Sequence, residues 1–194
     1  MKPTSSKAFT LVELLVTIVI LAILATIGFS GYNAIKLKAL CVKDISQMRK
    51  IGNGVLARAA ENNGYFYTRE EIGNSSFRAY EDRFSLCQVI DPWLEDEQVW
   101  MSPRPNPKLV RYGNTYAWSR APDVTQKSLG MQKNLGKLLL IWNAHTFTIP
   151  SVRNVAETAS NGGPRNASKQ YYYYPWKNGT AINWLYADGH VETR

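Results

Sequence analysis

The sequence predicts an α+β fold in which one long N-terminal helix packs on a small antiparallel-sheet domain. Three observations favour this fold. Near the N-terminus lies an apolar run, Phe9–Phe29, whose only charged residue is Glu13. The polar stretch after this run keeps apolar residues at spacings of three and four, which place them on one face of a helix. The remaining residues, 64–194, hold most of the aromatic side chains in short runs separated by turn residues, as in a small sheet domain.

The apolar run, residues 9–29, has the length of a membrane-spanning helix. At about 1.5 Å per residue it extends for about 30 Å, the thickness of a bilayer hydrocarbon core. The leader before it, residues 1–8, is short and basic, so the positive-inside tendency places the leader in the cytoplasm and the rest of the chain outside. A cleaved secretory signal would have a shorter apolar region of about 7–15 residues. We therefore expect one transmembrane helix.

Residues 30–63 predict an amphipathic continuation of the same helix. One stripe carries the apolar residues Leu37, Cys41, Ile45, Met48, Ile51, Val55 and Ala59. Lysine and arginine residues cover the other faces, and Asn62-Asn63-Gly64 is a stop signal of the kind that follows a helix. The two parts together make one continuous helix of about 50 residues, with a rise of about 1.5 Å per residue. Its outer half is expected to pack on the domain of residues 64–194, and its inner half to meet lipid or other subunits.

Glu13 needs a partner, because a carboxylate in hydrocarbon costs a few kcal/mol. It lies one helical turn after Phe9. If the chain were cut before Phe9, the new α-amine would be a natural counter-charge for Glu13 of a neighbouring copy. The alternative is a carboxyl group that snorkels to the interface or is protonated there.

The segment Lys7–Leu15, with the sequence KAFTLVELL, resembles the processing and methylation signature of type IV pilins and type II secretion pseudopilins. The resemblance implies that a prepilin peptidase cleaves between Ala8 and Phe9 and that Phe9 is then N-methylated. It also implies that Glu13 neutralises a neighbouring subunit's amino terminus during filament assembly. The sequence departs from the usual pattern at Ala8, where glycine is more common.

The same resemblance implies partners and a location. The partners would be further copies of the chain, other pseudopilins, the prepilin peptidase and an inner-membrane assembly platform. The protein would be a single-pass protein of the bacterial inner membrane, with residues 64–194 in the periplasm or on a surface filament. The implied fold is pilin-like, and the implied role is that of a structural subunit.

The C-terminal residues predict a β-hairpin, with two short strands on either side of Asp188-Gly189, a pair suited to a two-residue turn. Residues 112–118 and 137–142 also have strand patterns. The ending Asp-Gly-His-Val resembles that of a large pseudopilin-like group. This resemblance favours a subunit that supports protein secretion, and a type IV pilus subunit for adhesion or DNA uptake is the alternative.

Asp188 and Glu192 are the candidate metal ligands. They share one face of the hairpin because alternate residues of a strand point the same way. Major pseudopilins, which the sequence resembles, often hold calcium in a C-terminal loop. Calcium takes six to eight oxygen ligands, however, and only two carboxylates are local here. We therefore predict a solvated hairpin face and no metal or other cofactor, with calcium as the alternative.

Cys41 and Cys87 are the only cysteines, and both would face an oxidising compartment. Two outcomes are open. A disulfide could tie the helix to the sheet domain, since Cys41 lies on the inward stripe. Otherwise both are unpaired buried thiols.

Enzymatic function has little support, because the sequence has no nucleophile-elbow motif and no glycine-rich phosphate loop. The aromatic run Tyr171–Trp176, within the basic stretch 104–177, suggests a different hypothesis, a membrane-anchored module that binds glycan or nucleic acid. We do not favour nucleic acid as the partner. Residues 61–97 hold nine acidic residues against three arginines, whereas 36–58 and 104–177 are strongly basic. These patches suit either head-to-tail contacts between copies or ordinary solvated faces.

Overall fold

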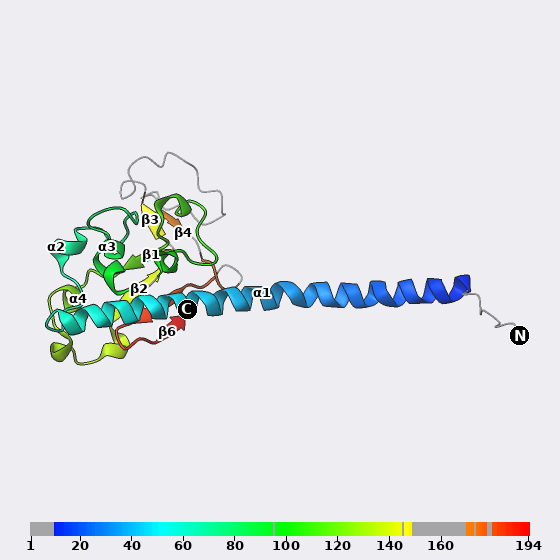
Figure 1. Cartoon of the computed structure of the whole chain (residues 1–194), viewed down its shortest axis with the longest axis horizontal. Coiled ribbons are helices and arrows are strands. Elements are labelled where there is room, and N and C mark those ends of the chain that lie inside the picture. The colour runs from blue at the N-terminus through cyan, green and yellow to red at the C-terminus, as the bar shows by residue number, and fades with distance from the viewer. Residues whose placement is uncertain (1–9, 95, 145, 149–169, 173, 178–179) are drawn as a thin grey trace, which may run out of the picture. The chain divides into compact units, whose positions relative to one another are not determined.

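A computed structural model describes residues 10–94, 96–144, 146–148, 170–172, 174–177 and 180–194 (Figure 1). The chain divides into two units, residues 1–39 and 40–194. The fold is α+β, with a pilin-like layout of one long N-terminal helix and a small four-stranded antiparallel sheet. The predicted fold class is therefore confirmed.

The long helix α1 spans Leu11–Glu61, 51 residues, close to the length predicted from the apolar run and the stripe. It ends where the sequence predicts. The backbone turns left-handed at Asn63 (φ 52°) and Gly64 (φ 84°). The Gly64 N–H then donates to the Ala59 carbonyl over 2.8 Å, which satisfies one of the last carbonyls of the helix.

In the second unit α1 packs through the predicted stripe. Met48, Ile51, Val55 and Ala59 are fully buried, and they belong to the main core. Full burial of each of the three larger side chains, Met48, Ile51 and Val55, contributes about 1.5–3 kcal/mol to the stability of the fold. The stripe prediction is therefore confirmed for these residues.

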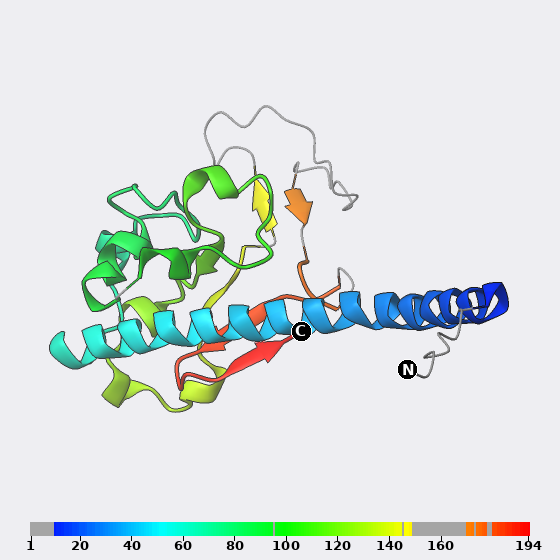
Figure 2. The ribbon, with the colours of Figure 1, turned by 45° about the vertical axis from the view of Figure 1, so that its right-hand side comes forward.

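Two glycines let other elements approach α1 closely. A Cβ atom added at Gly52 would lie 3.2 Å from the methyl groups of Leu185, and one at Gly54 would lie 2.9 Å from Leu94 Cδ2. Leu185 comes from the C-terminal hairpin, which runs beside this part of α1 in Figure 2. Leu94 follows the short helices on another side of α1. The helix is thus contacted on two sides, each at a position without a side chain.

The four-stranded sheet has the order β1-β2-β5-β6, with every neighbouring pair antiparallel. Its strands are β1 (Tyr116–Trp118), β2 (Leu139–Asn143), β5 (Asn183–Tyr186) and β6 (Val191–Thr193). A separate two-stranded sheet pairs β3 (Thr146–Thr148) with β4 (Gln170–Tyr172). The predicted strand at 137–142 is confirmed within two residues. The predicted strand at 112–118 exists only in its last three residues, because Val110–Tyr112 forms a 3-10 turn and Gly113 is left-handed (φ 66°).

The sheet separates two apolar clusters. Tyr116 and Trp118 of β1 point into the main core with α1, whereas Ala117 between them joins a smaller cluster with Phe77 and Leu109. This alternation is the period of two expected of a strand buried on both faces. An irregularity in β2 shifts the register between Leu139 and Ile141.

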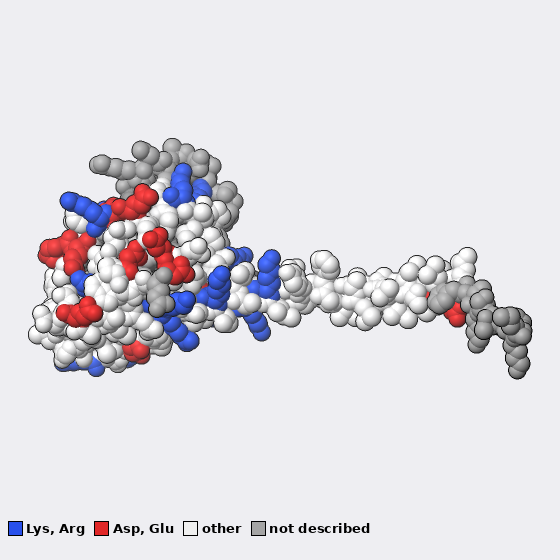
Figure 3. Space-filling model, viewed as in Figure 1, with Lys and Arg blue, Asp and Glu red and all other residues white. Residues whose placement is uncertain are grey.

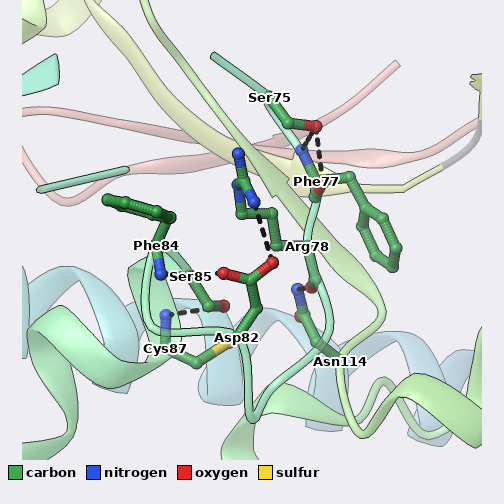
Figure 4. Close-up of polar contacts among 8 residues, drawn as sticks. All are labelled: Ser75, Phe77, Arg78, Asp82, Phe84, Ser85, Cys87 and Asn114. Atoms are coloured by element: carbon green, nitrogen blue, oxygen red, sulfur yellow. Dashed lines mark hydrogen bonds and ion pairs between the residues drawn. The ribbon is translucent and has the colours of Figure 1, made fainter. Parts of the chain in front are cut away.

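Short helices and turns connect α1 to β1 and β1 to β2. They are α2 (Arg69–Ile72), α3 (Leu86–Ile90), α4 (Pro122–Thr125) and the 3-10 turns at Asp91–Trp93, Glu97–Trp100, Val110–Tyr112, Leu129–Met131 and Leu135–Lys137. Figure 4 shows how side chains hold the loop before α3. Arg78 pairs with Asp82 over 2.8 Å, Asn114 Nδ2 donates to the Arg78 carbonyl over 3.1 Å, and the Cys87 N–H donates to Ser85 Oγ at the start of α3. The loop thus bonds to itself and to the segment leading into β1.

The predicted C-terminal hairpin is confirmed, but its turn is longer than expected. The loop has three residues, Ala187–Gly189, because the Tyr186 N–H donates to the His190 carbonyl and the Gly189 N–H donates to the Tyr186 carbonyl. Gly189 has φ +86°, whereas Asp188 is not left-handed. A two-residue turn of the expected kind needs positive φ at both positions, so the chain uses a turn followed by one left-handed glycine.

Candidate assembly segment at the start of α1

Glu13 lies in a capping box at the first turn of α1. Its Oε2 accepts hydrogen bonds from the Thr10 backbone N–H over 2.9 Å and from Thr10 Oγ1 over 2.8 Å. The Glu13 N–H donates back to Thr10 Oγ1 over 3.2 Å. The side chain of each residue thus accepts a hydrogen bond from the backbone N–H of the other, and these two N–H groups would otherwise have no partner within the helix. The sequence pattern Thr-x-x-Glu could have predicted this role for Glu13, and it was missed.

The capping box does not require the leader. Both of its residues follow the predicted cleavage point, so the helix start is preserved in a chain that begins at Phe9. Both accepted bonds use Oε2, and Glu13 Oε1 has no hydrogen bond to any residue that the structure describes. The carboxylate thus has a local partner and a second oxygen available for another group. Ala8 and Phe9 themselves lie outside the described residues.

The apolar run is exposed over all of its residues within α1, from Leu11 to Phe29. Thirteen large apolar side chains between Leu11 and Phe29 are between 48% and 81% exposed. The two hydroxyls in this stretch are satisfied inside the helix: Thr17 Oγ1 donates to the Leu14 carbonyl and Thr26 Oγ1 to the Ile23 carbonyl, both over 2.7 Å. The part of this stretch that follows the first turn, where Glu13 lies, is accordingly white in Figure 3. By length and composition, α1 is able to cross a membrane.

A buried carboxylate on α1, Asp44, was not predicted. It is fully buried and accepts hydrogen bonds from Tyr116 Oη over 2.7 Å, from Asn183 Nδ2 over 2.6 Å and from Asn143 Nδ2 over 3.0 Å. The donors come from β1, the end of β2 and the start of β5. Burial and the neighbouring Asp44 raise the pKa of Tyr116 well above its usual value, so its hydroxyl stays a donor. Asp44 falls three residues after Cys41 on the apolar stripe, which is the signal that could have identified it.

The two cysteines are free thiols in the structure. Cys41 is half-buried and contacts the Asn183 side chain, with Sγ 3.9 Å from Oδ1, whereas Cys87 is fully buried at the start of α3. Burial raises the pKa of both thiols, which favours the unreactive protonated form. The two side chains contact different elements, and no disulfide joins them in the structure. Whether the two thiols pair in the oxidising compartment stays a prediction.

The candidate metal ligands of the hairpin have other partners. Asp188 Oδ1 lies 2.5 Å from His190 Nδ1, and Glu192 Oε2 lies 2.6 Å from Arg194 Nη2. Desolvation acts to raise the pKa of Asp188, but the hydrogen bonds and charge of His190 outweigh it and hold the pKa below its usual value. The bond from Arg194 lowers the pKa of Glu192. Among the described residues, no three His, Cys, Asp or Glu side chains are grouped to hold a metal ion.

Residues 3–29 match the family model described as the prokaryotic N-terminal methylation motif. This motif is the signature of type IV pilins and pseudopilins, and it indicates a type IV pilin-like or pseudopilin substrate of prepilin peptidase. The family with this motif consists of structural subunits. No curated protein and no solved structure matches the chain. The similarity thus covers the start of the chain, including Glu13 and the whole exposed apolar stretch of α1 from Leu11 to Phe29.

Proposed function

We propose that the protein is a pseudopilin, a structural subunit of a type II secretion-like filament that supports protein secretion. The prepilin peptidase cleaves it between Ala8 and Phe9, Phe9 is N-methylated, and the mature chain polymerises through α1 from the inner membrane. The observation that carries the proposal is the capped Glu13 at the head of an exposed apolar helix, inside the methylation motif.

The exposed apolar stretch supports polymerisation through α1. Thirteen large apolar side chains facing water would be strongly unfavourable, so lipid or other apolar helices must cover them. Moving such a helix from lipid to a filament core gains little hydrophobic energy, because both surroundings are apolar. Packing and polar contacts then decide the association. A Glu13 carboxylate paired with the amine of Phe9 of the next copy supplies such a polar contact and fixes the axial register.

The test separates the charge of Glu13 from its capping role. Glutamine at the same position keeps the capping box, since it accepts the same hydrogen bonds, but it removes the charge. We expect Glu13→Gln and Glu13→Ala to insert in the membrane and to lose filament assembly, assayed by cross-linking and electron microscopy. Glu61→Ala, which removes the exposed glutamate at the other end of α1, is the matched control and should assemble normally. Normal filaments from Glu13→Gln would show that Glu13 acts only as a cap.

Intact mass and N-terminal sequencing of the protein from native membranes test the processing step. A chain that begins at methylated Phe9 supports the proposal. A chain that still begins at Met1 contradicts it, and would favour a permanently anchored binding module.

The choice of a pseudopilin over a surface pilin depends on the resemblance of the ending Asp188–Val191 to pseudopilin-like proteins. Deletion of the gene should then abolish secretion of proteins to the medium and leave surface pili unchanged. Filaments outside wild-type cells that contain this chain, with normal secretion in the deletion strain, would instead establish a type IV pilus subunit.

A further inference from the structure

A cavity of about 290 Å³ lies on the surface of the second unit, and its lining includes no residue of α1. Its lining comes from a single segment, residues 123–138, which includes α4 and the 3-10 turns Leu129–Met131 and Leu135–Lys137. Cavities that bind small molecules have volumes of about 300 Å³ and upwards, so this one is of the size that holds a single small unit.

The walls of the cavity are held at both ends by the folded core. The Leu129 N–H donates to the Gly64 carbonyl over 2.8 Å, which fixes one turn to the end of α1. The Ala187 N–H donates to the Leu138 carbonyl over 2.9 Å, which fixes the other end to the C-terminal hairpin. The side chain of Gln132 bonds to the Asp123 carbonyl across the segment. The lining is therefore supported by contacts far apart in the sequence.

The charge of the lining is strongly one-sided. Three lysines, Lys127, Lys133 and Lys137, line the cavity with a single carboxylate, Asp123. Asp123 is already paired with Lys127. Lys133 and Lys137 form no ion pair with any residue that the structure describes. A concavity lined by one sign of charge concentrates ions of the opposite sign, and lysine is a common ligand of phosphate.

The rest of the lining suits a sugar. Gln132 and Asn134 supply amide groups that bond to hydroxyls, and Met131 and Leu138 supply an apolar surface for the carbon face of a ring. Met131 is 65% exposed, so this apolar contact is accessible. A bare inorganic anion would use the lysines and leave these groups unused.

We propose that this cavity binds a monosaccharide unit that carries a negatively charged substituent, a phosphate or a carboxylate. Lys133 and Lys137 bind the charged group, and the amides of Gln132 and Asn134 bind hydroxyl groups. The site involves no residue of the exposed apolar stretch of α1.

The test measures binding to the full chain in detergent micelles, by isothermal titration calorimetry in a buffer without phosphate. The probes are glucose 6-phosphate and glucuronate, with neutral glucose and inorganic phosphate for comparison. We expect at least one of the two sugar acids to bind saturably, at least tenfold more tightly than glucose or inorganic phosphate. Raising the salt concentration should weaken this binding, because the site is open to solvent.

The double variant Lys133→Gln/Lys137→Gln should weaken the binding at least tenfold. Both lysines are exposed, so the variant is expected to fold, and circular dichroism checks this. The matched control, Lys43→Gln/Lys50→Gln, removes the same charge from exposed positions on α1 and should bind like the wild type. The proposal is overturned by absent binding of both sugar acids, by equal binding of glucose or inorganic phosphate, or by equal losses in the two variants.

Discussion

Asp44 provides the sharpest test of the described packing, because one side chain bonds to three strands. It accepts from Tyr116, Asn143 and Asn183 while fully buried, and none of the five ion pairs among the described residues includes it. Asp44→Ala leaves three buried donors without their acceptor. Each such loss costs about 1–3 kcal/mol. We therefore expect the free energy of unfolding to fall by about 3–9 kcal/mol, a large part of the 5–15 kcal/mol typical of a domain.

Asp44→Asn should lower the free energy of unfolding by less. The amide keeps one oxygen that accepts hydrogen bonds, and its NH2 group, in place of the other oxygen, faces one of the donors without accepting from it. We expect a loss of about 1–3 kcal/mol. The matched control is Ser46→Ala, at an exposed position two residues away on α1, with an expected change within about 0.5 kcal/mol. The order of stability should therefore be wild type and Ser46→Ala, then Asp44→Asn, then Asp44→Ala.

Urea unfolding of the full chain in micelles, followed by tryptophan fluorescence, measures these differences from the transition midpoints. Trp176 is a suitable reporter, because it is buried and its Nε1–H donates to Asn143 in the same network over 3.1 Å. A midpoint for Asp44→Ala equal to that of Ser46→Ala would refute the reasoning. It would mean that the three donors find other acceptors, and that Asp44 does not tie α1 to the sheet.

Three further predictions concern backbone packing and pH. Gly54→Ala places a methyl group 2.9 Å from Leu94 Cδ2 and should lower the midpoint of urea unfolding, because overpacking costs about 1–3 kcal/mol and the higher helix propensity of alanine offsets only part of it. The control Gly28→Ala, where an added Cβ would have no atom within 4 Å, should not lower the midpoint. Gly189→Ala forces a side chain into φ +86° and should cost about 1–2 kcal/mol of unfolding free energy in the same assay, and an unchanged midpoint would contradict the left-handed turn. The lowered pKa of Asp188 gives a contribution to stability that is present above its unfolded value of about 3.9 and is lost as pH falls through the folded value. Thermal unfolding of Asp188→Asn should therefore depend less steeply on pH in the acid range, and a slope equal to that of the wild type would argue against the bond to His190.

The long helix could be predicted from sequence because its signals are local. The apolar run, the stripe and the stop at Asn63-Gly64 each act within a few residues, and the structure has all three. The capping box of Thr10 and Glu13 is equally local, and the pattern Thr-x-x-Glu at the start of an apolar run is its signal. Asp44 shows the opposite case. Its position on the stripe was visible, but its donors lie 72, 99 and 139 residues away along the chain, and no pattern near Asp44 specifies them.

The sheet was less predictable because its strands are three to five residues long. A run of three residues, such as β1, has too few alternations to distinguish a strand from a turn. The pairing of β2 with β5 and the burial of β1 on both faces depend on contacts with α1 and with the loop around Phe77. The hairpin was recognised because Asp188-Gly189 is a strong turn signal, yet the sequence pair did not determine the number of residues in the loop.

The burial of Asp44 also changes the meaning of the charge pattern. It is the only acidic residue between Lys36 and Arg58, so the exposed surface of α1 around Lys43 and Lys50 carries basic side chains without a compensating carboxylate.

The acidic stretch 61–97 is partly neutralised inside the same chain. Glu71 pairs with the buried Arg58 over 2.5 Å, Asp82 pairs with Arg78, and Asp91 accepts from Trp100 Nε1 over 2.9 Å. Glu71 and Asp82 are compensated by an arginine of the same chain and therefore contribute less to an attraction between copies, whereas the bond from the neutral indole leaves the charge of Asp91 in place. The acidic surface that is available to attract a basic surface of a neighbouring subunit is therefore smaller than the number of acidic residues in 61–97 implies. Electrostatic contacts between the sheet domains of two copies are then better suited to orienting the copies than to driving their association. We expect packing of the apolar stretch of α1 to supply the driving force.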